Sequence, residues 1–171
     1  MAVLEHNRIL LLDQSGQQLL DRVLEKGQNR VAHFHPANDA TPDEIILGLE
    51  DKRIITWNGS LSSRTGQFET LKGTGAVYAY DLLGSGESQI ISGTLKNGVY
   101  AYTRDGQLLW SFDTQDRVET LYVADIDKDG YPEIIAGSED RNVYVLDHEG
   151  HLKWRYRTLR GAMDIEVCDI K

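Results

Sequence analysis

The feature that most constrains this chain is an internal repeat. Residues 81–114 align with residues 125–158 at a shift of 44 residues, without a gap over 34 positions. Gly86 matches Gly130 under this shift, and Trp110 matches Trp154. A weaker copy covers 44–57, and partial copies lie at 2–13 and 163–169. Units of this length stack on one another, because a single unit cannot bury its own hydrophobic surface.

Each repeat contains four short segments with the composition of β-strands. In the best copy they cover residues 120–124, 133–136, 142–146 and 152–156, which are rich in Ile, Val and Tyr. Turn dipeptides separate them, such as Asp129-Gly130 and Glu149-Gly150. Four strands in about 44 residues is the size of one β-propeller blade. We therefore expect an all-β fold, a β-propeller of four-stranded antiparallel blades.

The repeat boundaries predict one domain with about four blade-equivalents over residues 1–171. We expect a partial blade at 1–27, blades at 28–72, 73–115 and 116–159, and the first strand of a further blade at 160–171. The two ends would then complete a shared or swapped blade, because a closed ring leaves no unpaired strand edge. Three arrangements remain open: a closed four-bladed monomer, two chains that exchange terminal strands, and part of a larger propeller. We favour the homodimer, because four narrow wedges must twist strongly to close a ring.

Two stretches resemble known repeats. Residues 123–137, which read VADIDKDGYPEIIAG, resemble the FG-GAP/VCBS repeat of integrin-α-type propellers. Residues 99–114 and 143–158 resemble the PQQ-like propeller repeat, with their shared Gly, Leu and Trp positions. The first resemblance implies a cation-binding loop between strands. The second recurs in propellers of unrelated function and implies the blade framework.

One constellation carries chemistry. Asp125, Asp127 and Asp129 alternate, Gly130 permits a sharp turn, and the Tyr131 carbonyl and the Glu133 carboxylate follow. Oxygen ligands at positions 1, 3, 5, 7 and 9 suit Ca²⁺, whereas Mg²⁺ prefers a tighter octahedral shell. We expect these five residues to hold a structural Ca²⁺ ion, because clustered carboxylates repel one another unless a cation or protons neutralise them. The alternative is an acidic hairpin loop whose Asp and Gly serve turn geometry alone.

Other candidate residues favour ordinary structural roles. The matching loop that begins at Asp81 carries too few carboxylates for a metal, and no site is expected between His35 and Glu44. His33 and His35 share a strand face without an evident third ligand. The paired tryptophans are expected to pack between neighbouring blades.

Composition narrows the function further. Acidic residues number 27 and basic residues 18, and this net charge of −9 argues against nonspecific nucleic-acid binding. No apolar run approaches the roughly 18 residues of a membrane helix, and no targeting signal is evident, so a cytoplasmic location is the default expectation. The leading hypothesis is a non-catalytic, calcium-binding interaction module that binds a protein partner or a second copy. The alternatives are a quinoprotein-type dehydrogenase fragment and a calcium-dependent glycan-binding protein.

Overall fold

The computed structural model describes residues 2–5, 8–12, 15–23, 29–35, 44–59 and 62–167. This part of the chain contains fifteen β-strands and no helix. Within it, no segment has the helical length and apolar character that a membrane span requires. The prediction of an all-β fold of antiparallel four-stranded units is confirmed.

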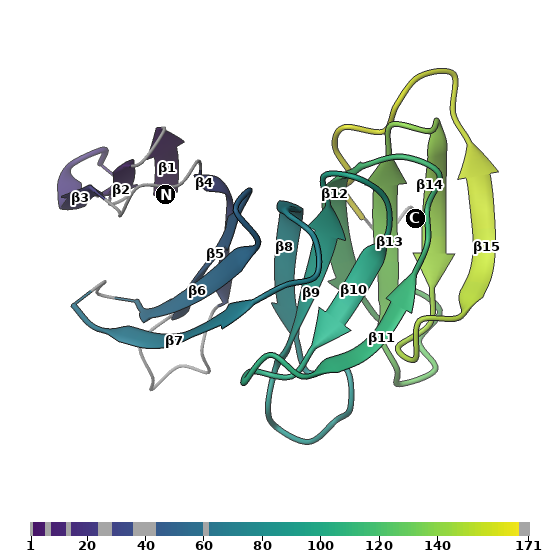
Figure 1. Ribbon diagram of the computed structural model, residues 1–171, viewed down its shortest axis with the longest axis horizontal. Helices are drawn as coiled ribbons and strands as arrows, with labels where there is room; N and C mark the ends of the chain where they lie inside the picture. Colours follow the sequence, from purple (N-terminus) through teal and green to yellow (C-terminus); the bar gives the residue numbers. More distant parts are fainter. Residues whose placement is uncertain are drawn as a thin grey trace.

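The strands form four antiparallel sheets in chain order (Figure 1). The first sheet contains β1 (Ala2–Glu5), β2 (Arg8–Leu12) and β3 (Gln18–Val23). The second contains β4 (Asn29–His35), β5 (Glu44–Leu49), β6 (Arg53–Asn58) and β7 (Arg64–Glu69). The third contains β8 (Thr74–Tyr80), β9 (Gln89–Thr94), β10 (Val99–Tyr102) and β11 (Leu108–Phe112). The fourth contains β12 (Val118–Ala124), β13 (Glu133–Ser138), β14 (Asn142–Leu146) and β15 (Leu152–Arg157).

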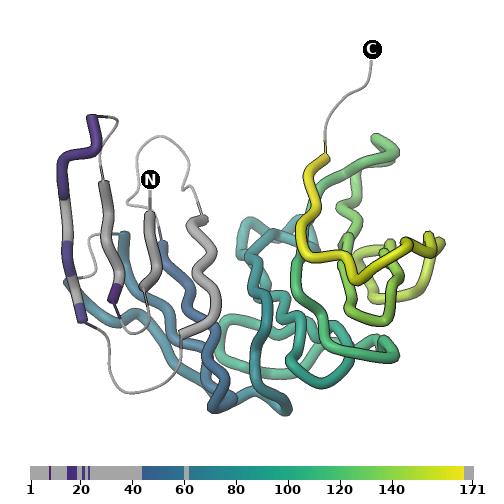
Figure 2. The backbone as a smooth tube through the Cα atoms, turned by 90° about the horizontal axis from the view of Figure 1, so that it is seen from above, coloured from purple at the N-terminus to yellow at the C-terminus, as the bar shows by residue number. Residues whose placement is uncertain are grey.

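The sheets stack face to face along an open arc (Figure 2). The first strands of the second, third and fourth sheets contact one another in order, so they form the inner side of the arc. β9 and β13 are buried along their whole length, whereas β15 is exposed along its whole length. The core therefore lies between the sheets and thins toward the outer strands.

A glycine on the second strand of each complete sheet allows the next sheet to approach. A β-carbon at Gly93 would lie 2.6 Å from Val118 Cγ1 of the next sheet. One at Gly137 would lie 3.0 Å from Ala162 Cβ of the segment after β15, and 2.6 Å from Thr120 Cγ2 of its own sheet. Such distances are shorter than carbon contacts in packed interiors, so only glycine fits. The repeated glycine is thus a packing requirement between sheets.

A β-bulge recurs at the start of each fourth strand. The register shifts opposite Thr56, Ala101 and Val145, which leaves Thr65, Leu109 and Lys153 as the extra residue of the outer strand. A bulge redirects the extra side chain relative to the regular alternation. In these three sheets, the alternation of apolar and polar residues along the strand therefore does not predict the direction of this side chain.

The first strand of a further blade, expected within 160–171, is not formed in the described part of that segment. Residues 161–167 carry no strand, and 168–171 lie outside the described residues. The backbone of a strand needs a neighbouring edge to pair with, and no sheet edge is paired with this segment. The Ala162 amide donates to the Ser138 carbonyl at 3.1 Å, which holds the beginning of this segment against the fourth sheet.

Candidate functional site

The β12–β13 loop is closed by the first residue of the predicted metal motif. The Asp125 carboxylate accepts the amides of Asp129 at 3.1 Å and Gly130 at 3.0 Å. Asp129 turns away and accepts the Tyr131 amide at 2.9 Å. Aspartate commonly stabilises turns by accepting amides of its own loop. Part of the acidic pattern is therefore accounted for by loop geometry.

The loop of the preceding sheet folds in the same way with fewer acids. Asp81 accepts the amides of Ser85 at 3.0 Å and Gly86 at 2.6 Å, at the positions that match Asp129 and Gly130. Burial alone would raise the pKa of Asp81, but the loop amides outweigh it and lower the pKa. The two loops thus make the same hydrogen bonds from backbone amides to their first aspartate, although their net charges differ.

Glu133 adds a buried carboxylate to the β12–β13 loop. Its side chain is only 2% exposed, and its Oε2 accepts the Ile126 amide at 3.0 Å. In the preceding sheet Gln89 holds the same place and accepts the Leu82 amide at 2.7 Å. The neutral amide satisfies the loop without a cation, whereas a buried carboxylate requires a compensating charge.

That charge is supplied by Lys153, the bulge residue of β15. Its ammonium donates to Glu133 Oε1 at 2.8 Å and to Asp127 Oδ2 at 2.6 Å. The hydrogen bond from Lys153 lowers the pKa of Asp127, and the two carboxylates raise the pKa of Lys153. The ion pair with Asp127 therefore adds stability above the unfolded carboxyl pKa of about 3.9 and loses it as the pH falls through the lower folded value.

The sequence pattern did not reveal Lys153, although the repeat contains a signal for it. Lys153 and Asp127 match Leu109 and Leu83 in the preceding repeat, so two apolar residues are exchanged together for two opposite charges. The paired exchange indicates spatial proximity, which the bulge produces. The bound cation was predicted because clustered carboxylates repel one another. The Lys153 ammonium reduces that repulsion, since it pairs with both Asp127 and Glu133.

The remaining metal-ligand geometry fits a hard cation in part. One oxygen each from Asp125, Asp127 and Glu133 lies within 4.8 Å of the others. Asp129 is outside this group, and the Tyr131 ring is 55% exposed and stacks on His148 with a centroid distance of 4.6 Å. Three converging carboxylates can coordinate Ca²⁺, but the cation would have to displace the Lys153 ammonium.

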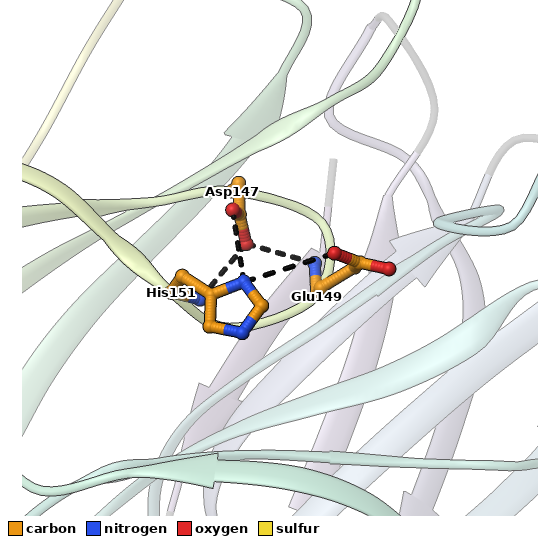
Figure 3. Close-up of side chains that lie close together, drawn as sticks. All are labelled: Asp147, Glu149 and His151. Atoms are coloured by element: carbon orange, nitrogen blue, oxygen red, sulfur yellow. Dashed lines mark hydrogen bonds and ion pairs between the residues drawn. The ribbon is translucent and has the colours of Figure 1, made fainter.

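A second cluster lies on the β14–β15 hairpin turn (Figure 3). Asp147, Glu149 and His151 bring one ligand atom each within 4.8 Å, and His151 Nδ1 lies 3.2 Å from Asp147 Oδ2. Burial would raise the pKa of Asp147, but the amide and ring of His151 and the amide of Glu149 lower it. Thr103 accepts the matching amide in the preceding sheet at 3.0 Å, so Asp147 serves as a turn-closing residue. The side chains of His33 and His35 and residues 36–43 lie outside the described part.

Comparison with known proteins identifies the architecture. Residues 89–171 match the family described as the lambda-carrageenase beta-propeller domain. The sheets are blades of a β-propeller. A structure of BBS1N in complex with ARL6DN, soaked with mercury, aligns with a TM-score of 0.72 at 14% identity and covers 93% of this chain and 50% of that chain. Sqt1 of Saccharomyces cerevisiae aligns with a TM-score of 0.71 at 11% identity, over 90% of this chain and 46% of that one.

The propeller chains in these structures are longer than this one. The chain spans about half the length of the solved structures it matches. No curated protein matches the sequence. At identities this low the structural likeness shows the fold, and function has to be argued from the site.

The loops of the third and fourth blades enclose a groove of about 490 Å³. Asp81 and Gly86 line it from one blade, and Asp125, Gly130 and Tyr131 line it from the next. Because amides of their own loops hold both aspartates, the walls of the groove are fixed. The arrangement provides a concave acidic surface whose lining includes two tyrosines, Tyr80 and the exposed Tyr131.

Proposed function

We propose that this chain is a non-catalytic β-propeller scaffold that binds a protein partner at the groove between the third and fourth blades. The observation that carries the proposal is the exposed Tyr131 ring beside a groove with two fixed aspartates. Tyrosine is enriched at protein interfaces, where one rigid ring contributes a large contact area. The acidic walls favour a partner with a basic contact surface.

Two further observations support an interaction role. The groove aspartates are occupied by loop amides, which leaves them poorly placed for proton transfer to a substrate. The BBS1N structure, which shares this fold, is a complex with another protein, ARL6DN. We extend the scaffold proposal to self-association through the terminal strands.

Photo-cross-linking from the groove tests the proposed function. A benzophenone amino acid at position 131, introduced into the chain in its native cells, is expected to give one dominant light-dependent protein adduct. The control is position 71, where Leu71 is 60% exposed and lies at the opposite end of β8. Equal adducts at both positions, or none at position 131, would contradict a groove-bound partner.

We also propose that Ca²⁺ binds at Asp125, Asp127 and Glu133 in competition with Lys153. The three oxygens can converge on a cation, with Asp129 and the Tyr131 carbonyl as the remaining predicted ligands. The ammonium opposes entry of the ion, so the affinity should fall at the weak end of the protein range, about 10⁻³ M. The ion would then link β12, β13 and the loop between them.

Removing the competitor is expected to strengthen calcium binding. Lys153→Met should lower the Ca²⁺ dissociation constant by about tenfold or more, because one repelling unit charge leaves the site. Isothermal titration of the chelator-treated protein measures this change, and Lys153→Met with Asp127→Ala serves as the control without binding. Absence of calcium binding up to about 10 mM in both the wild type and Lys153→Met would exclude the ion.

A further inference from the structure

One contact recurs where the third and fourth blades each meet the blade before them. The outer hairpin turn of a blade places its glycine on an aromatic ring of the preceding blade. A β-carbon at Gly106 would lie 2.6 Å from Phe68, and one at Gly150 would lie 2.6 Å from Trp110. The Trp110 indole also donates to the His148 carbonyl of the same turn at 3.0 Å. This turn-on-ring contact forms the outer part of the interface between blades.

The fourth blade has the aromatic ring of this contact, and no turn of the described residues covers it. Trp154 matches Trp110 and is 49% exposed, and Tyr156 matches Phe112 and is 66% exposed. Phe112 in its own interface packs edge-on against Tyr144 of the next blade at a centroid distance of 5.4 Å. Two large aromatic side chains on one strand face are costly to leave in water.

The first blade has the glycine turn of this contact, and no ring lies beneath it in the part of the chain that the structure describes. Gly16 in Ser-Gly-Gln matches Gly106 in Asp-Gly-Gln, and its φ of +81° resembles +89° at Gly106 and +86° at Gly150. Among the described residues, no atom lies within 4 Å of a β-carbon built at Gly16. Gly16 lies in the turn between β2 and β3, and Trp154 lies on β15. These strands lie at opposite ends of the arc (Figure 1), so one copy does not bring the turn and the ring together.

We propose that two copies of the chain associate head to tail, with the Gly16 turn of each copy seated on Trp154 of the other. The proposal deepens the self-association part of the proposed function and is independent of the groove partner. The contact continues an interface that the chain already makes twice within itself. In this contact the glycine turn would pack flat on the Trp154 ring, and a carbonyl of the turn would accept a hydrogen bond from the Trp154 indole.

The course of the chain after β15 agrees with this partner. Ala162 packs on Gly137 as Val118 packs on Gly93, so the chain enters the path of a further inner strand. The first sheet contains three strands in the described residues, and the edge of β1 that faces away from β2 is unpaired there. In the two-copy ring the 162–167 segment of one copy lies beside β1 of the other. Head-to-tail contacts form a closed ring when the rotations that relate successive copies add up to a full turn. Two copies of four sheets each would give a ring of eight blades.

Light scattering coupled to gel filtration tests the proposal on the full chain. The wild type is expected at twice 19.3 kDa, and Trp154→Lys and Gly16→Val are each expected at 19.3 kDa. Gly84→Val is the matched control, because Gly84 also has a positive φ of +64° and open space around it. This variant should keep the mass of the wild type. Near-identical melting curves of the two monomeric variants show that they remain folded.

Mixing the two variants separates loss of the contact from loss of the fold. A mixed pair contains one intact contact, between Gly16 of the Trp154→Lys chain and Trp154 of the Gly16→Val chain. Particles of twice the chain mass should therefore reappear on mixing, although neither variant forms them alone. A wild-type mass other than twice 19.3 kDa overturns the proposal, as does a dimer that both substitutions leave unchanged. Cross-linking from position 131 is unaffected by either outcome.

Discussion

Replacing Gly93 with valine is expected to lower the free energy of unfolding by about 3 kcal/mol, the upper part of the usual range for an overfilled core. A β-carbon at this position would lie 2.6 Å from Val118 Cγ1, 3.0 Å from Val118 Cβ and 3.3 Å from Ala76 Cβ. Val118 is fully buried and Ala76 nearly so, which leaves neither free to move aside. The third and fourth blades would have to separate or bend to admit the side chain.

Urea unfolding followed by tryptophan fluorescence measures this change. Ser111→Val is the matched control, because it places the same side chain on the exposed outer strand β11 of the same blade. The control should alter stability by no more than about 0.5 kcal/mol. Equal effects of the two substitutions would mean that the blades do not depend on close approach at Gly93.

Most of the fold was predictable because residues that make equivalent packing contacts recur at equivalent positions of the repeat. Gly93 and Gly137 recur at one spacing because each meets the chain that follows its own sheet, at Val118 and Ala162 respectively. Trp110 was expected between blades and is found there, with its indole bonded to the next blade. Trp154 shares the sequence position yet is half exposed. A repeat predicts which surface a blade presents, but not whether another blade covers it.

The site was predictable only in part, for a physical reason. The spacing of Asp125 and Gly130 predicted a turn, and the turn is formed by hydrogen bonds that Asp81 also makes without the other acids. Lys153 lies 20 residues beyond Glu133, and its direction depends on a bulge in the outer strand. Alternation along a strand does not reveal such a contact, because the bulge breaks the alternation.

Replacing Lys153 with methionine is expected to lower the free energy of unfolding at pH 7 by about 2 kcal/mol. Removing one partner of a buried ion pair usually costs about 3–5 kcal/mol, and the 30% exposure of the Lys153 side chain reduces the effect. The cost arises at Glu133, which keeps its bond to the Ile126 amide but loses its compensating charge. Urea unfolding in the presence of a chelator measures this cost without a contribution from bound cations.

The decisive comparison removes both charges together. Glu133→Gln with Lys153→Leu gives the fourth blade the residues that Gln89 and Leu109 supply in the third. Glutamine can accept the Ile126 amide as Gln89 accepts the Leu82 amide, and it brings no charge into the interior. The double variant should therefore lie within about 0.5 kcal/mol of the wild type, because an ion pair and a neutral pair of similar volume are often equivalent in stability. A double variant as unstable as Lys153→Met would mean that the lysine acts through packing of its stem, and not through the charge of Glu133.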